Sequence, residues 1–344
     1  MDQALRTGWR MTGPGQLTWF EEPLRPPPPG HVTVEVVGCG VCHTDLGYLY
    51  DGVRPAHPGP LVLGHEIIGR GPDGGLVLVP AVSPCGECPA CRRGRPTACA
   101  AALMPGNHHD GGFASHVQVP QRWLTPVPEV AEPWRLAAIA DAVTTPLQAV
   151  RRTGLGAGDV AIVVGAGGVG GFLVEIAAAL GATVIAIDVA PGRLDRALAH
   201  GARLAIDGHG LDPKGARKEL ARRLTAAVPE APDAGWHVFE CSGSPTGQLL
   251  AFALLTRGGK LAIVGFTPEV VPLRLSNLMA LDAEAYGNWG ADPALYPEAL
   301  AMVLAGKIDV ASAVGRHALR DAPEVLMQLH HHQLDHRPVL VPHV

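Results

Sequence analysis

The chain has 344 residues, of which 47% are hydrophobic and 17% charged, so it can bury the cores of about two domains and is not a disordered protein. Its formal net charge is -5 and its 27 Lys and Arg form no basic block, which argues against a nucleic-acid partner. The longest uncharged apolar stretch, Val160–Val174, is too short to span a membrane, so we expect no membrane partner.

The seven cysteines point to metal binding rather than to disulfides. The segment Met1–Arg10 has no basic start followed by an apolar stretch, and so it predicts no secretory signal. We therefore expect a cytoplasmic protein. In a reducing compartment, clustered cysteines are more often metal ligands or catalytic groups than disulfides.

Residues 1–146 are rich in Pro and Gly and contain short β-type runs at His31–Val37 and Leu76–Val79. We find no sustained helical periodicity before Pro133. This part of the chain predicts a compact, mostly β domain with long functional loops.

From Val160 onward, short apolar strands alternate with helical stretches, a pattern that predicts a doubly wound parallel sheet with helices on both faces. The expected strands are Val160–Val164, Thr183–Ile187, Arg203–Ile206, Trp236–Glu240 and Lys260–Val264. The expected helices are Gly168–Leu180, Arg193–His200, Pro213–Ala227 and Pro245–Thr256.

The last segment predicts a helix at Tyr296–Ala305 and an apolar strand at Pro338–Val341, which we assign back to the first domain. The domains are then residues 1–146 with 291–344, and residues 147–290. We interpret the run His330–His332 as a solvated helix end rather than a metal site.

The motif G-x-G-x-x-G, formed by Gly165, Gly167 and Gly170, follows the first of these strands and opens a helix. Bare backbone and a helix N-terminus can receive a pyrophosphate there. Asp188 follows the next strand and is placed to accept hydrogen bonds from the ribose hydroxyls, which favours NAD over NADP. The alternatives are a glycine turn that serves only packing and a solvated carboxylate at a strand end.

A second motif, C-x2-C-x2-C-x7-C, predicts a closed tetrahedral zinc site that supports structure. Its ligands would be Cys85, Cys88, Cys91 and Cys99. An iron–sulfur cluster and free thiols are the alternatives.

A dispersed group consists of Cys42 and His65, with Glu66 beside the histidine. Upstream of a dinucleotide turn, such residues can hold a zinc ion with an open position that polarises an alcohol oxygen. Taken singly, each is more often a packing residue. Cys39 and Cys42 also form a C-x-x-C, so a thiol redox pair is a competing interpretation.

Together these motifs resemble the zinc-containing medium-chain alcohol dehydrogenases over nearly the whole chain. The resemblance implies a mostly β GroES-like catalytic domain and a Rossmann cofactor domain. It implies two zinc ions per chain, with the four-cysteine motif at the structural one. The catalytic zinc would be held by Cys42, His65 and Asp141, with Glu66 behind the metal and Asp45 orienting His65. Asp141 stands where the family commonly has a cysteine, in the pattern A-x-x-x-C-A-x-x-T matched by residues 137–145.

The resemblance also implies roles around the substrate and an NAD cofactor. Thr44 would take the proton from the alcohol. The cofactor would be bound by His43 and Arg337 at the pyrophosphate, by Thr145 and Val169 behind the nicotinamide, by Val264 at the carboxamide, by Arg193 beside the adenosine ribose, and by Asp188 with the glycine turn. We expect a homodimer or homotetramer, as is usual in the family.

The expected reaction is hydride transfer between NAD and a secondary alcohol or ketone. Within the family, residues 38–47, 50–54, 104–107, 111–116, 140–146 and 275–280 resemble a subgroup that oxidises an allylic ring alcohol on a coenzyme A thioester. Cations for such a thioester could come from Arg54, Arg274, Arg92, Arg93 or Arg95, unless these are ordinary surface arginines. The alternatives are another secondary-alcohol or polyol dehydrogenase, a zinc-independent enoyl reductase, or an inert zinc-binding module.

Overall fold

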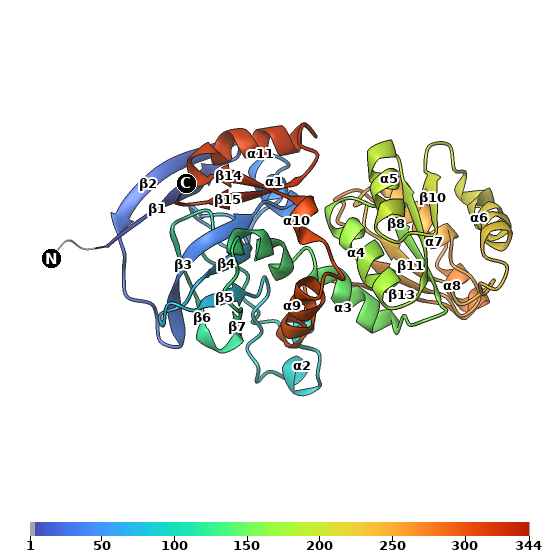
Figure 1. Ribbon diagram of the computed structural model, residues 1–344, viewed down its shortest axis with the longest axis horizontal. Coiled ribbons are helices and arrows are strands. Elements are labelled where there is room, and N and C mark those ends of the chain that lie inside the picture. The colour runs from blue at the N-terminus through green and yellow to red at the C-terminus, as the bar shows by residue number, and fades with distance from the viewer. Residues whose placement is uncertain (1–3, 344) are drawn as a thin grey trace. The chain divides into compact units, whose positions relative to one another are not determined.

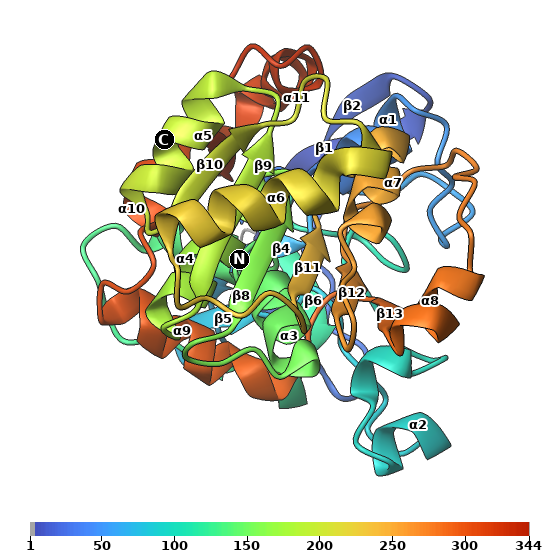
Figure 2. The ribbon, with the colours of Figure 1, turned by 90° about the vertical axis from the view of Figure 1, so that its right-hand side faces the viewer.

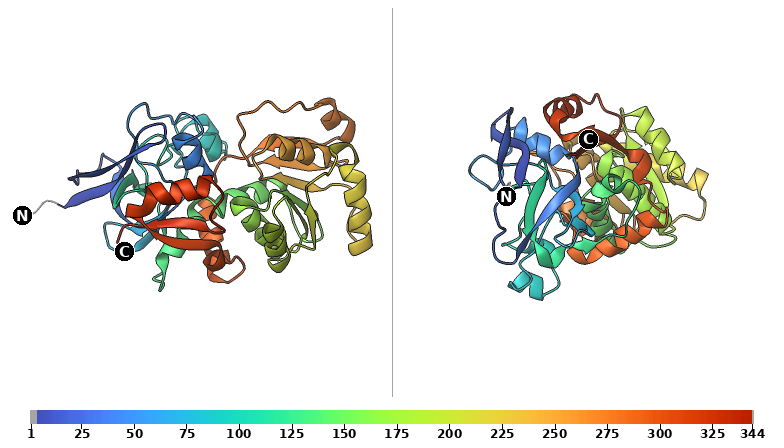
Figure 3. Two further views of the ribbon diagram at one scale, coloured as in Figure 1. Left: turned by 90° about the horizontal axis from the view of Figure 1, so that it is seen from above. Right: turned by 60° about the vertical axis from the view of Figure 1, so that its left-hand side comes forward.

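The computed structural model describes residues 4–343, which divide into two compact units (Figure 1). The first, called here the β-rich unit, takes Met1–Thr144, Gly290–Val303 and Asp309–Val344. The second, the α/β unit, takes Thr145–Trp289 and Leu304–Ile308. The first and last strands both belong to the β-rich unit, so the chain leaves this unit and returns to it (Figure 3).

The β-rich unit combines an antiparallel two-stranded ribbon, β1–β2, with a seven-stranded sheet in the order β14-β15-β3-β4-β5-β7, where β6 also pairs with β3. Its strands are β1 Leu5–Gly13, β2 Gln16–Pro23, β3 His31–Gly40, β4 Glu66–Arg70, β5 Leu76–Val79, β6 His116–Pro120, β7 Thr125–Pro126, β14 Val314–Ala318 and β15 Arg337–Val341. Its helices and helical turns are α1 His43–Leu49, α2 Pro89–Arg92, η1 Pro96–Ala98, η2 Gln121–Trp123, η3 Pro133–Ala140, η4 Pro293–Leu295, α9 Tyr296–Leu304, α10 Val310–Ala313, η5 Leu319–Asp321 and α11 Ala322–His330.

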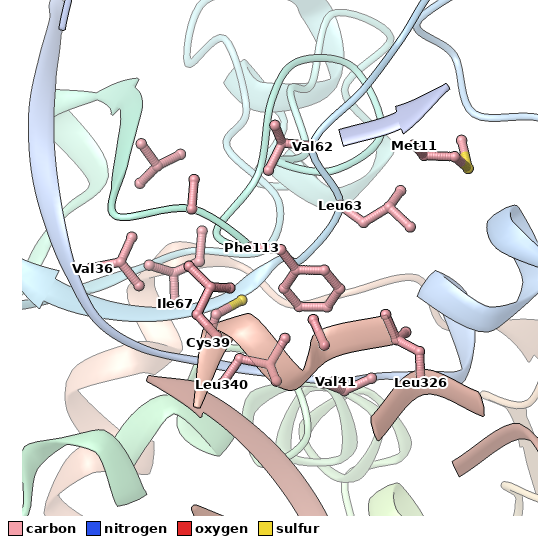
Figure 4. Close-up of a cluster of buried hydrophobic side chains, with 14 of the residues drawn as sticks. Met11, Val36, Cys39, Val41, Val62, Leu63, Ile67, Phe113, Leu326 and Leu340 are labelled. Carbon is pink, nitrogen blue, oxygen red and sulfur yellow. The ribbon is translucent and has the colours of Figure 1, made fainter. Parts of the chain in front are cut away.

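The core of this unit draws side chains from distant parts of the chain (Figure 4). Phe113, fully buried, lies among Ile67 of β4, Leu340 of β15 and Leu326 of α11. The last strand is fixed because Leu340 pairs with Cys39 on β3. Burial of this apolar surface holds the loops that carry the candidate ligands.

Before Pro133, where the sequence shows no sustained helical periodicity, the structure has only the short α-helices α1 and α2 and two 3₁₀ turns within the described residues. The short helix α1 begins where the Asp45 carboxylate accepts a hydrogen bond from the backbone N–H of Cys42, at 2.9 Å. It buries only Leu46, Leu49 and Asp45 itself. Seven residues are too few to show a helical period in the sequence. The expected helix end at the histidine run is confirmed, since α11 ends at His330.

The α/β unit is a parallel six-stranded sheet in the order β10-β9-β8-β11-β12-β13 (Figure 2). Its strands are β8 Val160–Val164, β9 Thr183–Asp188, β10 Leu204–Asp207, β11 His237–Glu240, β12 Lys260–Ile263 and β13 Glu284–Gly287. Its helices are α3 Thr144–Thr153, α4 Gly168–Ala179, α5 Pro191–Ala199, α6 Pro213–Ala227, α7 Pro245–Ala253 and α8 Ser276–Leu281. The predicted α/β fold class with a Rossmann-type sheet is thereby confirmed.

The strand order reverses between β8 and β11, and right-handed crossovers then place α4 and α5 on one face of the sheet and α6 and α7 on the other. In sheets of this kind, ligands bind beyond the carboxyl ends of the strands, at the point of reversal. None of the helices over residues 4–343 has the length and apolar character needed to cross a membrane.

Candidate metal centres and cofactor turn

The structure brings the dispersed residues Cys42, His65, Glu66 and Asp141 together in the β-rich unit. One ligand atom from each lies within 4.8 Å of all the others. Cys42 precedes α1, His65 and Glu66 lie at the start of β4, and Asp141 follows η3. The Nε2 atom of His65 lies 3.6 Å from Oδ2 of Asp141. These donor atoms are close enough to share one metal ion.

Asp45 joins the two loops that carry Cys42 and His65. One carboxylate oxygen accepts from the Cys42 backbone, and the other accepts from the backbone N–H of Gly64 at 3.0 Å. Asp45 was predicted to orient His65, but its Oδ1 lies 3.6 Å from Nδ1 of His65, which is beyond hydrogen-bond distance. Asp45 therefore positions the histidine through the backbone.

Asp141 lies in a turn between η3 and α3, with φ -143° and ψ -54°. The turn is fixed by Tyr296, whose hydroxyl donates to the carbonyl of Ala140 and accepts from the backbone N–H of Ala81, at 2.8 Å. Tyr296 is fully buried. Sequence reasoning missed this residue, because nothing in the helical pattern of 296–304 links it to a turn more than 150 residues earlier.

Glu66 forms a buried ion pair with Arg337 at the start of β15. The Nε atom of Arg337 donates to Oε2 of Glu66 at 2.7 Å, and a second hydrogen bond joins Nη2 to Oε1. Arg337 was predicted at the cofactor pyrophosphate; the contacts in the β-rich unit instead hold it on Glu66, because a fully buried carboxylate requires a counter-charge. A contact between Arg337 and the cofactor stays a prediction.

The electrostatics of the group favour a cation. Burial lowers the pKa of His65, but Asp45 and Asp141 outweigh burial and raise that pKa well above its usual value. Carboxylates that hold a proton on an imidazole also stabilise a divalent ion in its place. Thiolate, imidazole and carboxylate together form a donor set that suits zinc.

The competing redox pair is not supported by the structure. Cys39 and Cys42 are both free thiols. Burial raises the pKa of Cys39 well above its usual value, and the carboxylate of Asp45 raises it further. A thiol that resists ionisation is a poor nucleophile for disulfide exchange.

The four-cysteine motif also comes together: the sulfur atoms of Cys85, Cys88, Cys91 and Cys99 lie within 4.8 Å of one another. The Sγ of Cys88 lies 3.5 Å from that of Cys91 and 3.7 Å from that of Cys99. A tetrahedral zinc site with Zn–S bonds of about 2.3 Å needs sulfur atoms about 3.8 Å apart. The backbone N–H of Cys91 lowers the pKa of Cys88 to about 6, whereas burial raises the pKa of Cys91 to about 12, so Cys88 becomes a thiolate more readily than Cys91.

The glycine turn and Asp188 lie side by side at the carboxyl edge of the parallel sheet. Gly165 has φ +90°, and a Cβ there would lie 2.5 Å from the backbone nitrogen of Ser242. Asp188 accepts from the backbone N–H of Ala166 at 2.7 Å and from that of Ala190 at 2.9 Å. Asp188 is only 6% exposed, so it is not a solvated carboxylate. It fixes the end of β9 to the glycine turn, a role that sequence reasoning missed.

The other predicted cofactor residues divide between the units. His43, in the β-rich unit, is exposed and its ring stacks on that of His332, and Thr44 Oγ1 lies 3.7 Å from Cys42 Sγ. In the α/β unit, Arg193 Nη1 lies 3.6 Å from Asp188 Oδ1. Thr145 begins this unit and is buried, while Gly167, Val169 and Val264 are half-buried and Gly170 is buried.

Comparisons with known proteins agree with this geometry. Residues 28–129 match the family described as alcohol dehydrogenase GroES-like domain, and residues 168–305 match zinc-binding dehydrogenase. An alcohol dehydrogenase of Geobacillus stearothermophilus is 30% identical over 291 residues, or 81% of this chain and 82% of the relative. An L-threonine 3-dehydrogenase of Streptomyces coelicolor is 30% identical over 85% of this chain and 86% of its own length.

Among solved structures, alcohol dehydrogenase TADH from Thermus sp. ATN1 is 27% identical and superposes with a TM-score of 0.84, covering 97% of this chain and 99% of that one. The sequence matches extend through both units. The chain therefore belongs to the zinc-type medium-chain alcohol dehydrogenase family of enzymes.

Proposed function

We propose that this protein is an NAD-dependent dehydrogenase of secondary alcohols that binds a catalytic zinc through Cys42, His65 and Asp141. The observation that supports this most directly is the convergence of these three residues with Glu66 within 4.8 Å. Asp141 replaces the cysteine that is common in the family. A carboxylate is a harder donor than a thiolate, so the substitution keeps the charge but changes the electron density supplied to a metal.

The donor set fits zinc in both groups, and two ions per chain are proposed. When bound, zinc would supply Lewis-acid polarisation of the substrate oxygen, and NAD would accept the hydride. The hydroxyl of Thr44, beside Cys42, would receive the proton from the alcohol. Glu66, held by Arg337, would lie behind the three ligands as a further carboxylate that could bind the metal. The zinc of the four-cysteine motif would support structure only.

NAD is preferred over NADP in this proposal because the Asp188 carboxylate repels a 2′-phosphate. The test is Asp188→Asn, which keeps an acceptor oxygen for one of the two backbone N–H groups, those of Ala166 and Ala190, and removes the charge. We expect the ratio of kcat/KM for NAD to that for NADP to fall about tenfold or more, as expected when one charged contact is removed. Asp207→Asn is the matched control, since Asp207 is paired with Asp188 in the sheet register and is exposed. An unchanged ratio in Asp188→Asn would refute the assignment.

For the substrate, we propose a cyclic allylic alcohol, with the coenzyme A thioester 6-hydroxycyclohex-1-ene-1-carbonyl-CoA as the specific candidate. The cations available for its phosphates are exposed and have no carboxylate partner among residues 4–343: Arg54, Arg92, Arg93, Arg95 and Arg274. Another secondary-alcohol or polyol dehydrogenase is the second candidate, and the similarity to an L-threonine 3-dehydrogenase favours it.

The deciding experiment is an NADH-coupled assay with cyclic hydroxyacyl-CoA thioesters, the matching free cyclohexenols, polyols and L-threonine. Turnover confined to thioesters supports the first candidate, and turnover of polyols or amino-acid alcohols supports the second. Absence of NADH formation with every alcohol, and of NADH consumption with every ketone, would refute the proposed activity.

We also propose a homodimer or homotetramer that forms through the α/β unit. Among the described residues, β13 pairs only with β12, which leaves one strand edge open. Large apolar side chains on the segment between β12 and β13 are exposed, including Phe266, Leu275 and Met279. Light scattering of the wild type and of Met279→Glu would test this. Location in the cytoplasm stays a prediction. A reducing compartment would keep the thiols of the four-cysteine motif available for metal.

A further inference from the structure

Glu240, the last residue of β11, is a fully buried glutamate in the α/β unit that none of the roles above uses. Its Oε1 accepts from the backbone N–H of Ser242 at 2.8 Å, from the Ser242 hydroxyl at 2.6 Å and from the backbone N–H of Gly243 at 3.1 Å. One carboxylate oxygen therefore fixes the loop that follows β11.

The same residue also holds the loop that follows β12. Its backbone carbonyl accepts from the N–H of Val264 at 2.8 Å and from that of Gly265 at 2.9 Å. A Cβ on Gly265 would lie 2.8 Å from Oε2 of Glu240 and 2.3 Å from the nitrogen of Gly243. The two loops therefore meet over Glu240 with no room for a side chain.

Burying the Glu240 carboxylate costs free energy of folding, and an apolar side chain could pack at this position without that cost. Within the described residues, its Oε2 has no hydrogen-bond partner of good geometry. Burial raises the pKa of Glu240, and the hydrogen bonds from Ser242 and Gly243, together with the nearby backbone N–H of Gly265, oppose that rise. A buried polar atom without a partner is destabilising, and an apolar residue would fill the site at less cost.

The loop held by Glu240 contacts the glycine turn. Gly165 approaches Ser242 so closely that a Cβ would lie 2.5 Å from the Ser242 nitrogen. Glu240 thus stands between the turn after β8 and the loop after β12. Strands β8 and β11 are the pair where the strand order reverses, which is where ligands bind in such sheets.

We propose that Glu240 is a positioning residue for the nicotinamide cofactor, and that it fixes the loops after β11 and β12 in the conformation that binds the cofactor. This inference rests on the proposed function, because it requires that the α/β unit binds NAD. Glu240 touches no reacting atom in this scheme and acts through the backbone of Ser242–Gly243 and Val264–Gly265.

The test is NADH binding, followed by fluorescence titration, together with steady-state kinetics on Glu240→Ala, Glu240→Asp and Glu240→Gln. The Ala variant removes the carboxylate that accepts three hydrogen bonds from Ser242 and Gly243, and the Asp variant withdraws it, so Kd for NADH and KM for NAD should rise about tenfold or more. Because the chemical step is untouched, kcat should change much less. Gln keeps an acceptor oxygen at the same reach and should restore affinity close to that of the wild type.

Glu175→Gln is the matched control, since Glu175 is a buried glutamate of the same unit that lies 3.1 Å from His200. It should lower Tm without raising Kd. The inference is overturned if Glu240→Asp, which keeps the charge and is folded by circular dichroism, binds NADH as tightly as the wild type, or if Glu175→Gln weakens binding equally. Failure of the wild type itself to bind NADH would overturn the proposed cofactor instead.

Discussion

Arg337→Met isolates the buried charge beside the candidate metal group. Methionine has nearly the length of arginine but no charge and no N–H donors, so the variant leaves the Glu66 carboxylate buried without its partner. The Glu66 side chain is 0% exposed and that of Arg337 is 8% exposed, so water cannot replace the lost hydrogen bonds without rearrangement. Removing one partner of a buried ion pair costs about 3–5 kcal/mol. We expect the β-rich unit to lose stability in that range.

The loss should depend on pH. Burial raises the pKa of Glu66, and the charge of Arg337 opposes the rise, so the variant should raise this pKa further. When the folded-state pKa of a carboxyl group exceeds its unfolded pKa of about 4.3, the folded protein is most stable at low pH, where the group is protonated in both states. The free energy of unfolding then falls as pH rises through the folded-state pKa. The difference between wild type and Arg337→Met should therefore grow from pH 5 to pH 8.

Urea unfolding monitored by tryptophan fluorescence at pH 5 and pH 8, with zinc content measured in parallel, will test this. The double variant Arg337→Met/Glu66→Gln removes the unpaired charge and should recover most of the lost stability. A loss below about 1 kcal/mol, comparable to that of a surface pair, would refute the reasoning. Equal losses at both pH values, or no recovery in the double variant, would also contradict it.

Five further variants test the metal groups and a half-buried histidine, His109. Cys42→Ser should abolish turnover while the fold remains, because an open metal site does the chemistry. Cys88→Ser should mainly lower Tm, because a closed metal site supports structure. Finding one zinc per chain in active wild-type protein would contradict this. Asp141→Ala should remove catalytic zinc and activity, whereas Asp141→Cys should retain zinc and shift the pH–rate profile to higher pH; full activity in Asp141→Ala would exclude it as a ligand. Burial lowers the pKa of His109 to about 4, so the unfolded chain takes up a proton that the native state excludes, and stability should fall by about 3 kcal/mol at most between pH 6.5 and 4. His109→Gln should flatten this part of the pH–stability curve.

Local patterns in the sequence were sufficient for the parallel sheet. The strand Val160–Val164 and the helix Pro213–Ala227 have the bounds that periodicity predicts. A buried parallel strand is a continuous apolar run, and an amphipathic helix repeats every 3.6 residues, so both are visible in a short window. The four-cysteine group was equally visible, because all its ligands lie within fifteen residues.

The sequence alone did not show how the group of Cys42, His65, Glu66 and Asp141 is held together. Cys42, His65 and Asp141 could be proposed one by one from the family resemblance, but only the β-rich unit brings their donor atoms within reach of one ion. Tyr296, which fixes the turn that carries Asp141, and Arg337, which pairs with Glu66, both come from the far end of the chain. No local pattern marks such contacts, since they are formed when the last segment returns to pack on the first.

The tertiary structure also decided what the buried charges do. From sequence, Asp188 could only be a candidate ribose ligand, Arg337 a candidate pyrophosphate ligand, and Glu240 was an ordinary residue at a strand end. In the structure, each is partnered with backbone or charge from another element. The sequence by itself determined the parallel sheet and the four-cysteine group, because these depend on period and spacing, whereas the ligand role of Asp141 was implied by the family resemblance. Burial and long-range pairing determined the rest, because a charge taken out of water must find its partner wherever the fold supplies one.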